Sequence, residues 1–351
     1  MNSRLNSKLY IEDIQTVIKT LDIRSLNGKS IMISGATGMI GTFLIDLIMY
    51  HNANKNGNIR IIALGRNKEK GKARFSEYFD SSLFLFIECD ITKPITADIE
   101  SDYIIHAAST THPLAYSMEP IGTITSNVLG TINLLEYGIK HNLKRFVYVS
   151  SVEVYGENQS DTDRFDESYC GYINCNTLRA GYPESKRLCE TLCQAYRKEK
   201  NVEIVIPRLA RSFGPTMQMS DSKAIAQFIK KGLAKEDIVL KSKGDQLYTY
   251  TYTPDAVSGI LACLLNGLDG EAYNIASEEN EITLKNLAEM IATNCGVKVI
   301  YDIPDEIEKA GYSTATKATM TSDKARKEMN WQTIFSIEKG INKTIEIIHS
   351  L

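Results

Sequence analysis

The sequence predicts an α/β protein with a doubly wound parallel sheet and a smaller C-terminal lobe. Up to Pro207, short apolar runs alternate with segments of helical periodicity. Such strand–helix–strand repeats build a parallel sheet that is covered on both faces. After Pro207 the alternation stops and turn-rich stretches begin, such as Gly214-Pro215 and Gly244-Asp245. The length of 351 residues also fits two units of roughly 150 residues each.

Each element is predicted from its local pattern. Residues 1–28 are expected to form an N-terminal helical extension, because apolar side chains recur there at helical spacing. These are Ile11, Ile14, Val17, Ile18 and Leu21. The predicted strands are Ser30–Ser34, Ile59–Leu64, Leu83–Glu88, Tyr103–His106, Phe146–Ser150 and Glu203–Ile206. The predicted helices cover residues 39–50, 68–79, 122–141, 181–199, 283–294 and 336–348.

These elements suggest how the chain is divided. Residues 29–207 are expected to form the domain that holds the parallel sheet, and segment 245–277 is expected to return to it. Residues 208–351 are expected to form a smaller, interleaved lobe that closes over the carboxyl edge of the sheet and binds the substrate. Ligands of open α/β sheets bind at that edge.

Composition excludes several classes of protein. Hydrophobic residues at 43% and charged residues at 24% exclude disordered, collagen-like and coiled-coil chains. The net charge of −3 favours neither nucleic acid nor an anionic membrane as a partner. The seven cysteines form no CxxC pair, so we expect reduced thiols and no metal site. The polar N-terminus resembles no signal peptide, and the apolar window Ile31–Tyr50 contains three glycines and Asp46. A soluble, cytoplasmic protein is therefore expected.

A glycine-rich turn comes after the first predicted strand and opens a helix. It reads Gly35-Ala36-Thr37-Gly38-Met39-Ile40-Gly41. In such a turn the first glycine permits the bend, the second lets backbone approach a pyrophosphate, and the third lets helix and strand pack closely. The helix N-terminus adds free N–H groups and a positive partial charge. The pattern predicts a Rossmann-type dinucleotide site, with cofactor contacts from Gly35, Thr37, Gly38, Met39, Ile40 and Gly41.

The end of the second predicted strand departs from the usual NAD pattern. An acidic residue usually stands there to hold the ribose 2′-hydroxyl, whereas this chain reads Leu64-Gly65-Arg66. Arg66 fits stacking on adenine or pairing with a 2′-phosphate, and it equally fits a solvated loop. The predicted cofactor is NAD, with NADP left open.

Tyr182 and Lys186 stand four residues apart, so a helix places the lysine one turn after the tyrosine. An ammonium near a phenol favours the phenolate, which makes Tyr182 a candidate general base. Upstream, the strand that ends at Ser150 runs into the turn Ser151–Gly156. We expect that turn at the carboxyl edge of the sheet, where ligands bind.

At these motifs the chain resembles the extended short-chain dehydrogenase/reductase family, specifically its NAD-dependent nucleotide-sugar epimerases, dehydratases and decarboxylases. The matches run in family order from about residue 29 to 345. They are Ser34–Gly41, Asp90-Ile91, His106–Ser109, Asn127–Glu136, Ser150–Gly156, Tyr182–Lys186, Gly214-Pro215, Tyr273-Asn274 and Asp323-Lys324-Ala325 before Trp331.

The resemblance implies that a hydride passes from sugar C4 to a tightly held nicotinamide, which gives a 4-keto intermediate. In that chemistry Tyr182 takes the 4-hydroxyl proton and Ser151 shares the hydrogen bond. Lys186 lowers the pKa of the tyrosine and holds the nicotinamide ribose. Further cofactor contacts are implied for Asp90, Ile91, Ala107, Ala108, Ser109, Asn127, Ser150, Tyr182 and Lys186.

Glu153 bears on the fate of the 4-keto sugar. By resemblance, 4-epimerases usually have threonine or a small residue there, whereas a glutamate looks like the 4,6-dehydratases and the UDP-glucuronate decarboxylases. A carboxylate beside C5 can remove a proton made acidic by the ketone; otherwise Glu153 only orients the turn or pairs with a cation. Many dehydratases have an acid or a serine where this chain has Val152. Decarboxylation needs no such acid, and Arg179–Arg187 with Glu190 also resembles the decarboxylases.

Two positions differ from the family pattern and bear on substrate binding. Relatives usually have asparagine at the position of Arg211, and many have an arginine at the position of Tyr248 that grips the sugar diphosphate. Without it a bidentate phosphate clamp is missing, and Arg211 is the candidate to replace it from the other side of the site. Arg211 and Tyr248 are the predicted substrate-binding residues.

The sequence thus predicts an NAD(P)-dependent enzyme that modifies a nucleotide-diphosphate sugar through C4 oxidation, of the decarboxylase or dehydratase type. The alternatives are a nucleotide-sugar 4-epimerase and a cofactor-binding module without turnover. A homodimer is expected by resemblance through the helices near 122–141 and 181–199. There Leu188, Leu192 and Tyr196 supply an apolar stripe, although this spacing also suits a helix buried on its own sheet.

Overall fold

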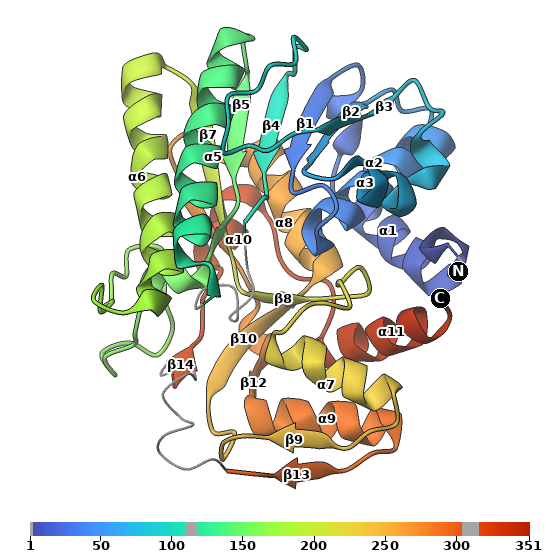
Figure 1. The fold of residues 1–351 in the computed structure, drawn as a ribbon, viewed down its shortest axis with the longest axis vertical. Coiled ribbons are helices and arrows are strands. Elements are labelled where there is room, and N and C mark those ends of the chain that lie inside the picture. Colours follow the sequence, from blue (N-terminus) through green and yellow to red (C-terminus); the bar gives the residue numbers. More distant parts are fainter. Residues whose placement is uncertain (1–2, 110–117, 304–315) are drawn as a thin grey trace.

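A computed structural model describes residues 3–109, 118–303 and 316–351. Its central feature is an all-parallel sheet of strand order β11-β7-β5-β4-β1-β2-β3, in which β6 also pairs with β7 (Figure 1). The strands are β1 Ser30–Ser34, β2 Arg60–Gly65, β3 Phe84–Glu88, β4 Tyr103–His106, β5 Arg145–Tyr148, β6 Ser150–Ser151, β7 Glu203–Leu209 and β11 Ala272–Ile275. The strand order reverses between β1 and β4, so ligands are expected at their carboxyl ends.

Helices cover both faces of this sheet. On one face α5 (Pro120–Lys140) packs along α6 (Gly181–Lys200), and on the other α2 (Met39–Asn54) packs on α8 (Thr253–Asn266) (Figure 1). Alternating residues of β1 serve the two layers: Ile31 and Ile33 join the core beneath α2 and α8, whereas Met32 joins the core beneath α5 and α6. A strand buried on both faces must be apolar throughout. The predicted doubly wound α/β fold is confirmed.

The C-terminal lobe has a smaller sheet and its own apolar core. In that sheet β10 lies between β12 and β14 and also pairs with β8, while β9 and β13 form a separate parallel pair. The strands are β8 Arg211–Phe213, β9 Ile238–Leu240, β10 Leu247–Tyr252, β12 Glu281–Thr283, β13 Val299–Tyr301 and β14 Lys317–Ala318. The helices include α7 Ala224–Leu233, α9 Leu284–Cys295, α10 Asp323–Met329 and α11 Ile337–His349.

The N-terminal segment forms α1 (Lys8–Thr20), which joins the two parts of the protein. It packs on α2 and α8 of the large domain and on α11, as Figure 1 shows. Its buried Asp13 accepts hydrogen bonds from Tyr252 Oη at 2.7 Å and from Lys343 Nζ at 2.6 Å. The remaining short helices are α3 Lys68–Arg74 and the 3₁₀ turns Arg4–Asn6, Ile23–Leu26, Ser76–Tyr78, Val152–Tyr155, Leu178–Ala180 and Glu278–Asn280.

The structure ends one predicted helix early and interrupts one predicted strand, whereas others extend further: helix 39–50 continues to Asn54 and strand Glu203–Ile206 continues to Leu209. The predicted helix 68–79 ends at Arg74, because the next residue, Phe75, turns inward and packs its ring against Phe84 at 5.4 Å. The predicted strand Phe146–Ser150 is interrupted at Val149, whose carbonyl accepts a hydrogen bond from Lys186 Nζ at 2.8 Å.

Segment 245–277 is divided between the two parts of the protein. Its first strand, β10, pairs with β8 and β12 in the lobe, whereas α8 and β11 pack in the large domain. The predicted boundary at residue 207 falls inside β7. The chain thus passes from the lobe back to the large domain within this segment. Such a passage depends on strand pairing between residues far apart in the sequence, which local patterns do not encode. Among the described helices none is long and apolar enough to cross a membrane.

Gly41 offers a test of the packing between β1 and α2. A Cβ atom at Gly41 would lie 2.4 Å from the Gly35 carbonyl oxygen and 2.8 Å from Ala36 Cα. Because both are backbone atoms, Gly41→Ala should lower the free energy of unfolding by about 1–3 kcal/mol, as measured by urea titration. The control is Gly122→Ala in α5, where the nearest atom is 3.8 Å away. Gly122→Ala should raise the free energy of unfolding by up to about 1 kcal/mol, because alanine favours the helix more than glycine does. Equal effects of both variants would contradict the expected clash.

Candidate active site

A short turn after β6 carries two of the predicted catalytic residues. Ser151 caps the turn, and its hydroxyl accepts a hydrogen bond from the Glu153 N–H at 3.3 Å. Val152 and Val154 are buried and anchor the turn, whereas Ser151 and Glu153 stay partly exposed. The turn ends at Gly156 with φ +71°, a conformation that favours glycine. Because buried and partly exposed residues alternate along the turn, the side chains of Ser151 and Glu153 lie on its solvent-accessible side.

Tyr182 approaches the same turn from the start of α6. Its side chain is buried, and its hydroxyl shares hydrogen bonds with Ser151 and Ser109. Burial raises the pKa of Tyr182 to about 12, the two hydrogen bonds lower it, and the charge of Glu153 raises it. The structure therefore places Ser151, Glu153 and Tyr182 together.

Lys186 lies one turn further along α6 and is also buried. Its ammonium donates to the Val149 carbonyl at 2.8 Å and lies 4.7 Å from the Tyr148 ring centroid. Burial lowers the pKa of Lys186 to about 8. Burial of the phenol raises the pKa of Tyr182, and the effect of Lys186 on that pKa, which the resemblance implied, stays a prediction.

A chain of hydrogen bonds connects the predicted cofactor residues Ser109 and Asn127 to the catalytic helix. Ser109 Oγ donates to Asn127 Oδ1 at 2.8 Å, and Asn127 Nδ2 donates to Ser185 Oγ at 2.8 Å. Ser185 Oγ in turn donates to the Tyr182 carbonyl at 2.8 Å. Ser185 was not predicted as a site residue, although its place within the Tyr182–Lys186 motif was a usable signal.

The glycine loop has the geometry that a dinucleotide phosphate needs. Gly35 has φ +72°, and a Cβ there would lie 2.7 Å from the Ala108 backbone, so the loop rests directly on Ala107 and Ala108. Gly38 is the N-cap of α2, and no described side chain caps the helix there. The Gly38 N–H donates within the turn, to the Gly35 carbonyl at 2.9 Å, whereas the N–H groups of the first turn of α2 are available to an anion. The residues present fit the pyrophosphate of NAD.

A segment of the lobe covers this loop, which sequence patterns did not indicate. Thr216 Oγ1 donates to the Met39 carbonyl at 2.8 Å, and Gln218 Nε2 donates to the Thr37 carbonyl at 3.0 Å. Ile40 lies next to Met39 in the first turn of α2. The lobe thus contacts the predicted cofactor loop directly.

The predicted adenine end of the site lies at the carboxyl ends of β2 and β3. Arg66 and Asp90 are both exposed there. The Thr92 hydroxyl and N–H lower the pKa of Asp90, and the charges of Lys93 and Arg66 lower it further. Ile91 is buried, and Asn133 Nδ2 donates to its carbonyl at 2.8 Å.

Ser150 faces a buried ion pair that the sequence did not reveal. Its hydroxyl donates to Glu190 Oε1 at 2.6 Å. Arg208 on β7 binds both oxygens of Glu190, at 3.0 and 2.6 Å. A signal was present, since Glu190 stands one helical turn after Lys186, but only the strand register places Arg208 opposite Ser150.

The two predicted substrate residues also meet. Arg211 starts β8, and its guanidinium carbon lies 4.0 Å from the Tyr248 ring centroid. Arg211 Nη2 donates to Glu153 Oε1 at 3.2 Å. The lobe therefore supplies a cation directly beside the catalytic turn.

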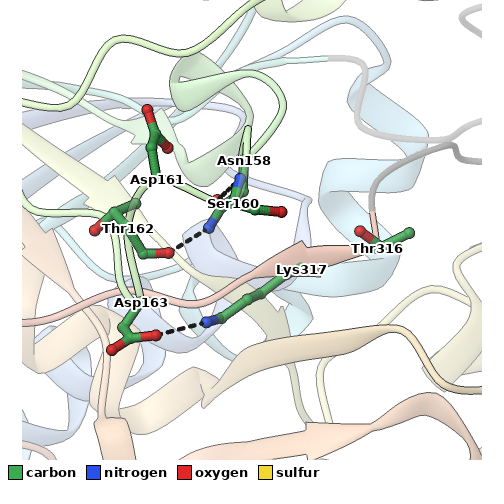
Figure 2. A pocket seen from close by; sticks show the side chains of 7 residues that line it. All are labelled: Asn158, Ser160, Asp161, Thr162, Asp163, Thr316 and Lys317. Atoms are coloured by element: carbon green, nitrogen blue, oxygen red, sulfur yellow. Dashed lines mark hydrogen bonds and ion pairs between the residues drawn. The ribbon is translucent and has the colours of Figure 1, made fainter.

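A polar cavity of about 380 Å³ lies elsewhere on the surface. Figure 2 shows it between residues 158–163 and β14, with Lys317 paired to Asp163. None of the predicted catalytic side chains lines it. Among the described residues, no cluster of histidine, cysteine and acidic side chains could hold a metal ion.

Comparisons with known proteins agree with this geometry. The model of the NAD dependent epimerase/dehydratase family matches residues 31–276, more than half of the chain. UDP-glucuronic acid decarboxylase 5 of Arabidopsis thaliana is 30% identical over 315 residues, which covers 89% of this chain and 86% of the relative. UDP-glucuronic acid decarboxylase 1 of Xenopus tropicalis is 29% identical over 321 residues, which covers 90% of this chain and 71% of the relative.

Solved structures share the fold. A UDP-glucose 4-epimerase from Thermotoga maritima superimposes with a TM-score of 0.79 at 22% identity, covering 92% of this chain and 99% of that one. A dTDP-glucose 4,6-dehydratase from Streptomyces venezuelae superimposes with a TM-score of 0.78 at 21% identity, covering 92% of this chain and 97% of that one. The chain belongs to the NAD dependent epimerase/dehydratase family of enzymes, whose cofactor is NAD, as the sequence predicted.

Proposed function

We propose that the protein decarboxylates a nucleotide-diphosphate uronic acid, with UDP-glucuronic acid as the first candidate substrate. The observation that carries the proposal is the position of Glu153, whose charge acts on the Tyr182 phenol. The preceding residue is the buried, apolar Val152. The UDP-glucuronic acid decarboxylases at 29–30% identity support the same substrate class.

In this proposal Tyr182 and Ser151 act on the 4-hydroxyl group of the sugar. Tyr182 as phenolate accepts the hydroxyl proton, and Ser151 hydrogen-bonds the same oxygen. A Tyr182 pKa of about 12 means that the phenolate fraction grows as the pH rises above neutral. The rate of C4 oxidation should therefore increase with pH in the mildly alkaline range.

Bound NAD supplies the acceptor for the C4 hydride. The C5–C6 bond of the resulting β-keto acid then breaks, carbon dioxide leaves, and the electron pair passes through C5 to the 4-keto oxygen. The Tyr182 and Ser151 hydroxyls hydrogen-bond that oxygen as its negative charge develops. A proton from solvent would then add at C5, the hydride would return from the bound cofactor to C4, and Tyr182 would give its proton back to the C4 oxygen. The product is a nucleotide-diphosphate pentose, and the cofactor is regenerated.

Dehydration would need different groups. Loss of a hydroxyl from C6 is assisted by a proton donor, and the valine side chain at position 152 has no proton to give. Loss of carbon dioxide needs no donor at C6, because the ketone at C4 accepts the electron pair. The apolar residue beside Glu153 therefore favours decarboxylation.

The direct test is the product formed from UDP-glucuronic acid with NAD. We expect release of one carbon dioxide per turnover and a product that is lighter by that mass. UDP-glucose serves as the comparison, because it can be oxidised at C4 but has no carboxylate to lose. A product of unchanged mass with inverted C4 would identify a 4-epimerase and would contradict this proposal.

Tyr182→Phe tests the assigned base. The ring packs as before, but no hydroxyl remains to ionise, so the oxidation rate should fall by roughly 10²–10⁴-fold while NAD still binds. Tyr196→Phe in the same helix is the matched control, because the Tyr196 hydroxyl bonds Glu136 at 2.7 Å on the exposed side. A loss below tenfold in Tyr182→Phe would mean that another group takes the proton.

We also propose a homodimer through α5 and α6, and a cytoplasmic location stays a prediction. The two helices expose Ile121, Ile124 and Leu188, with 77%, 40% and 47% of these side chains accessible. Leu192 and Tyr196 are half-buried along the same helix. Light scattering at micromolar concentration should give twice the chain mass, and Leu188→Glu should give a monomer. A monomeric wild-type protein would refute the proposal.

A further inference from the structure

The ion pair between Arg211 and Glu153 links the lobe to the catalytic turn. Arg211 lies on β8 of the lobe, and Glu153 lies just after β6 of the large domain. The side chains are 28% and 27% exposed, so the pair borders accessible space. Ser151 connects it to Tyr182, because the Ser151 hydroxyl bonds the Tyr182 phenol and accepts a hydrogen bond from the Glu153 N–H at 3.3 Å.

Tyr248 fixes the orientation of the guanidinium group. The Arg211 guanidinium carbon lies 4.0 Å from the Tyr248 ring centroid, within the range of a cation–π contact. When a ring covers the face of a guanidinium, its N–H groups point outward along the edge. That edge can offer two N–H groups to the two oxygens of a carboxylate. In this structure Glu153 takes one such bond, from Arg211 Nη2 to Glu153 Oε1 at 3.2 Å.

The pair also occupies the guanidinium edge that a substrate anion would use. Because Arg211 Nη2 donates to Glu153 Oε1 at 3.2 Å, an anion that binds there must displace Glu153. In a uronic acid, the C5 carboxylate is attached next to C4, where Tyr182 is proposed to act.

We propose that Arg211 selects sugars that have a carboxylate at C5, by exchanging Glu153 for that carboxylate when the substrate binds. Loss of carbon dioxide removes the competing anion, and Arg211 then returns to Glu153 as the product leaves. This inference rests on the proposed function and adds a specificity-determining residue to it. Tyr248 supports Arg211 but supplies no charge.

Lys223 places a second cation near Arg211. Burial lowers the pKa of Lys223, Asp221 at 3.8 Å raises it, and the charge of Arg211 lowers it further. The charges of Arg211 and Lys223 therefore act on each other, although each has an acidic partner. A negative charge from the substrate would be attracted by both cations, which favours an anionic sugar over a neutral one.

The test compares two ligands that differ only at C6. Protein loaded with NADH, which cannot oxidise C4, is titrated calorimetrically with UDP-glucuronic acid and with UDP-glucose. We expect the wild type to prefer UDP-glucuronic acid by tenfold or more. Arg211→Gln should weaken its binding by roughly tenfold to hundredfold, the usual range for a hydrogen bond to a charged group. Binding of UDP-glucose should change less than threefold.

Two further variants separate this role from a general structural one. Arg164→Gln removes an arginine that pairs with Glu281 of the lobe at 2.6 Å, and it should leave the preference unchanged. Glu153→Gln removes the competing carboxylate, so UDP-glucuronic acid should bind up to about fivefold more tightly. Arg211→Lys keeps the charge without the planar fork and should give an intermediate preference.

Equal weakening of both ligands by Arg211→Gln would overturn the inference, because it would indicate a diphosphate contact or a folding defect. Equal affinity of the wild type for the two ligands would overturn it as well. Selectivity that depends on Arg211 without release of carbon dioxide would support the inference and refute the proposed decarboxylation. The two failures are therefore distinguishable.

Discussion

Arg208 of β7 and Glu190 of α6 form a largely buried ion pair that fixes the turn of Ser151 and Glu153 against α6, the helix of Tyr182. Both side chains are less than 15% exposed. Glu190 also accepts from Ser150, which precedes the catalytic turn, and Arg208 also donates to Tyr155 Oη at 3.0 Å at the end of that turn. Loss of one partner in such a pair typically costs about 3–5 kcal/mol. The pair therefore joins the turn, the helix of Tyr182 and the strand behind them.

The site contains two glutamates whose surroundings differ. Glu190 is 13% exposed, and its two oxygens bond Arg208 and Ser150. Glu153 is partly exposed and pairs with Arg211, which comes from the other part of the protein. Environment commonly divides the roles of two carboxylates in this way. The enclosed glutamate suits a structural role, and the accessible one suits exchange with a substrate.

Contacts between the lobe and the cofactor loop couple binding to the packing of the two parts. Thr216 and Gln218 bond backbone carbonyls of the loop, and Arg74 donates to the Thr216 carbonyl at 2.5 Å. Helix α2, which begins at the loop, is fixed further along by Asp46, a fully buried carboxylate that accepts from Arg4 and Tyr10. The loop is thus held from both sides, and the N–H groups that are predicted to bind phosphate keep their direction. Preorganisation of this kind reduces the cost of binding.

The sequence by itself determined the parallel sheet, the glycine loop and the Tyr182–Lys186 pair, because each depends on residues close together in the chain. Strand periodicity, the bend at Gly35 and one turn of helix are local properties. Only the tertiary structure decided that Lys186 faces the Val149 carbonyl, that Arg208 holds Glu190, and that Arg211 reaches Glu153. These contacts join β7, α6 and the lobe across long stretches of chain. Their partners are chosen by sheet register and by the satisfaction of buried charge, and a local sequence pattern records neither.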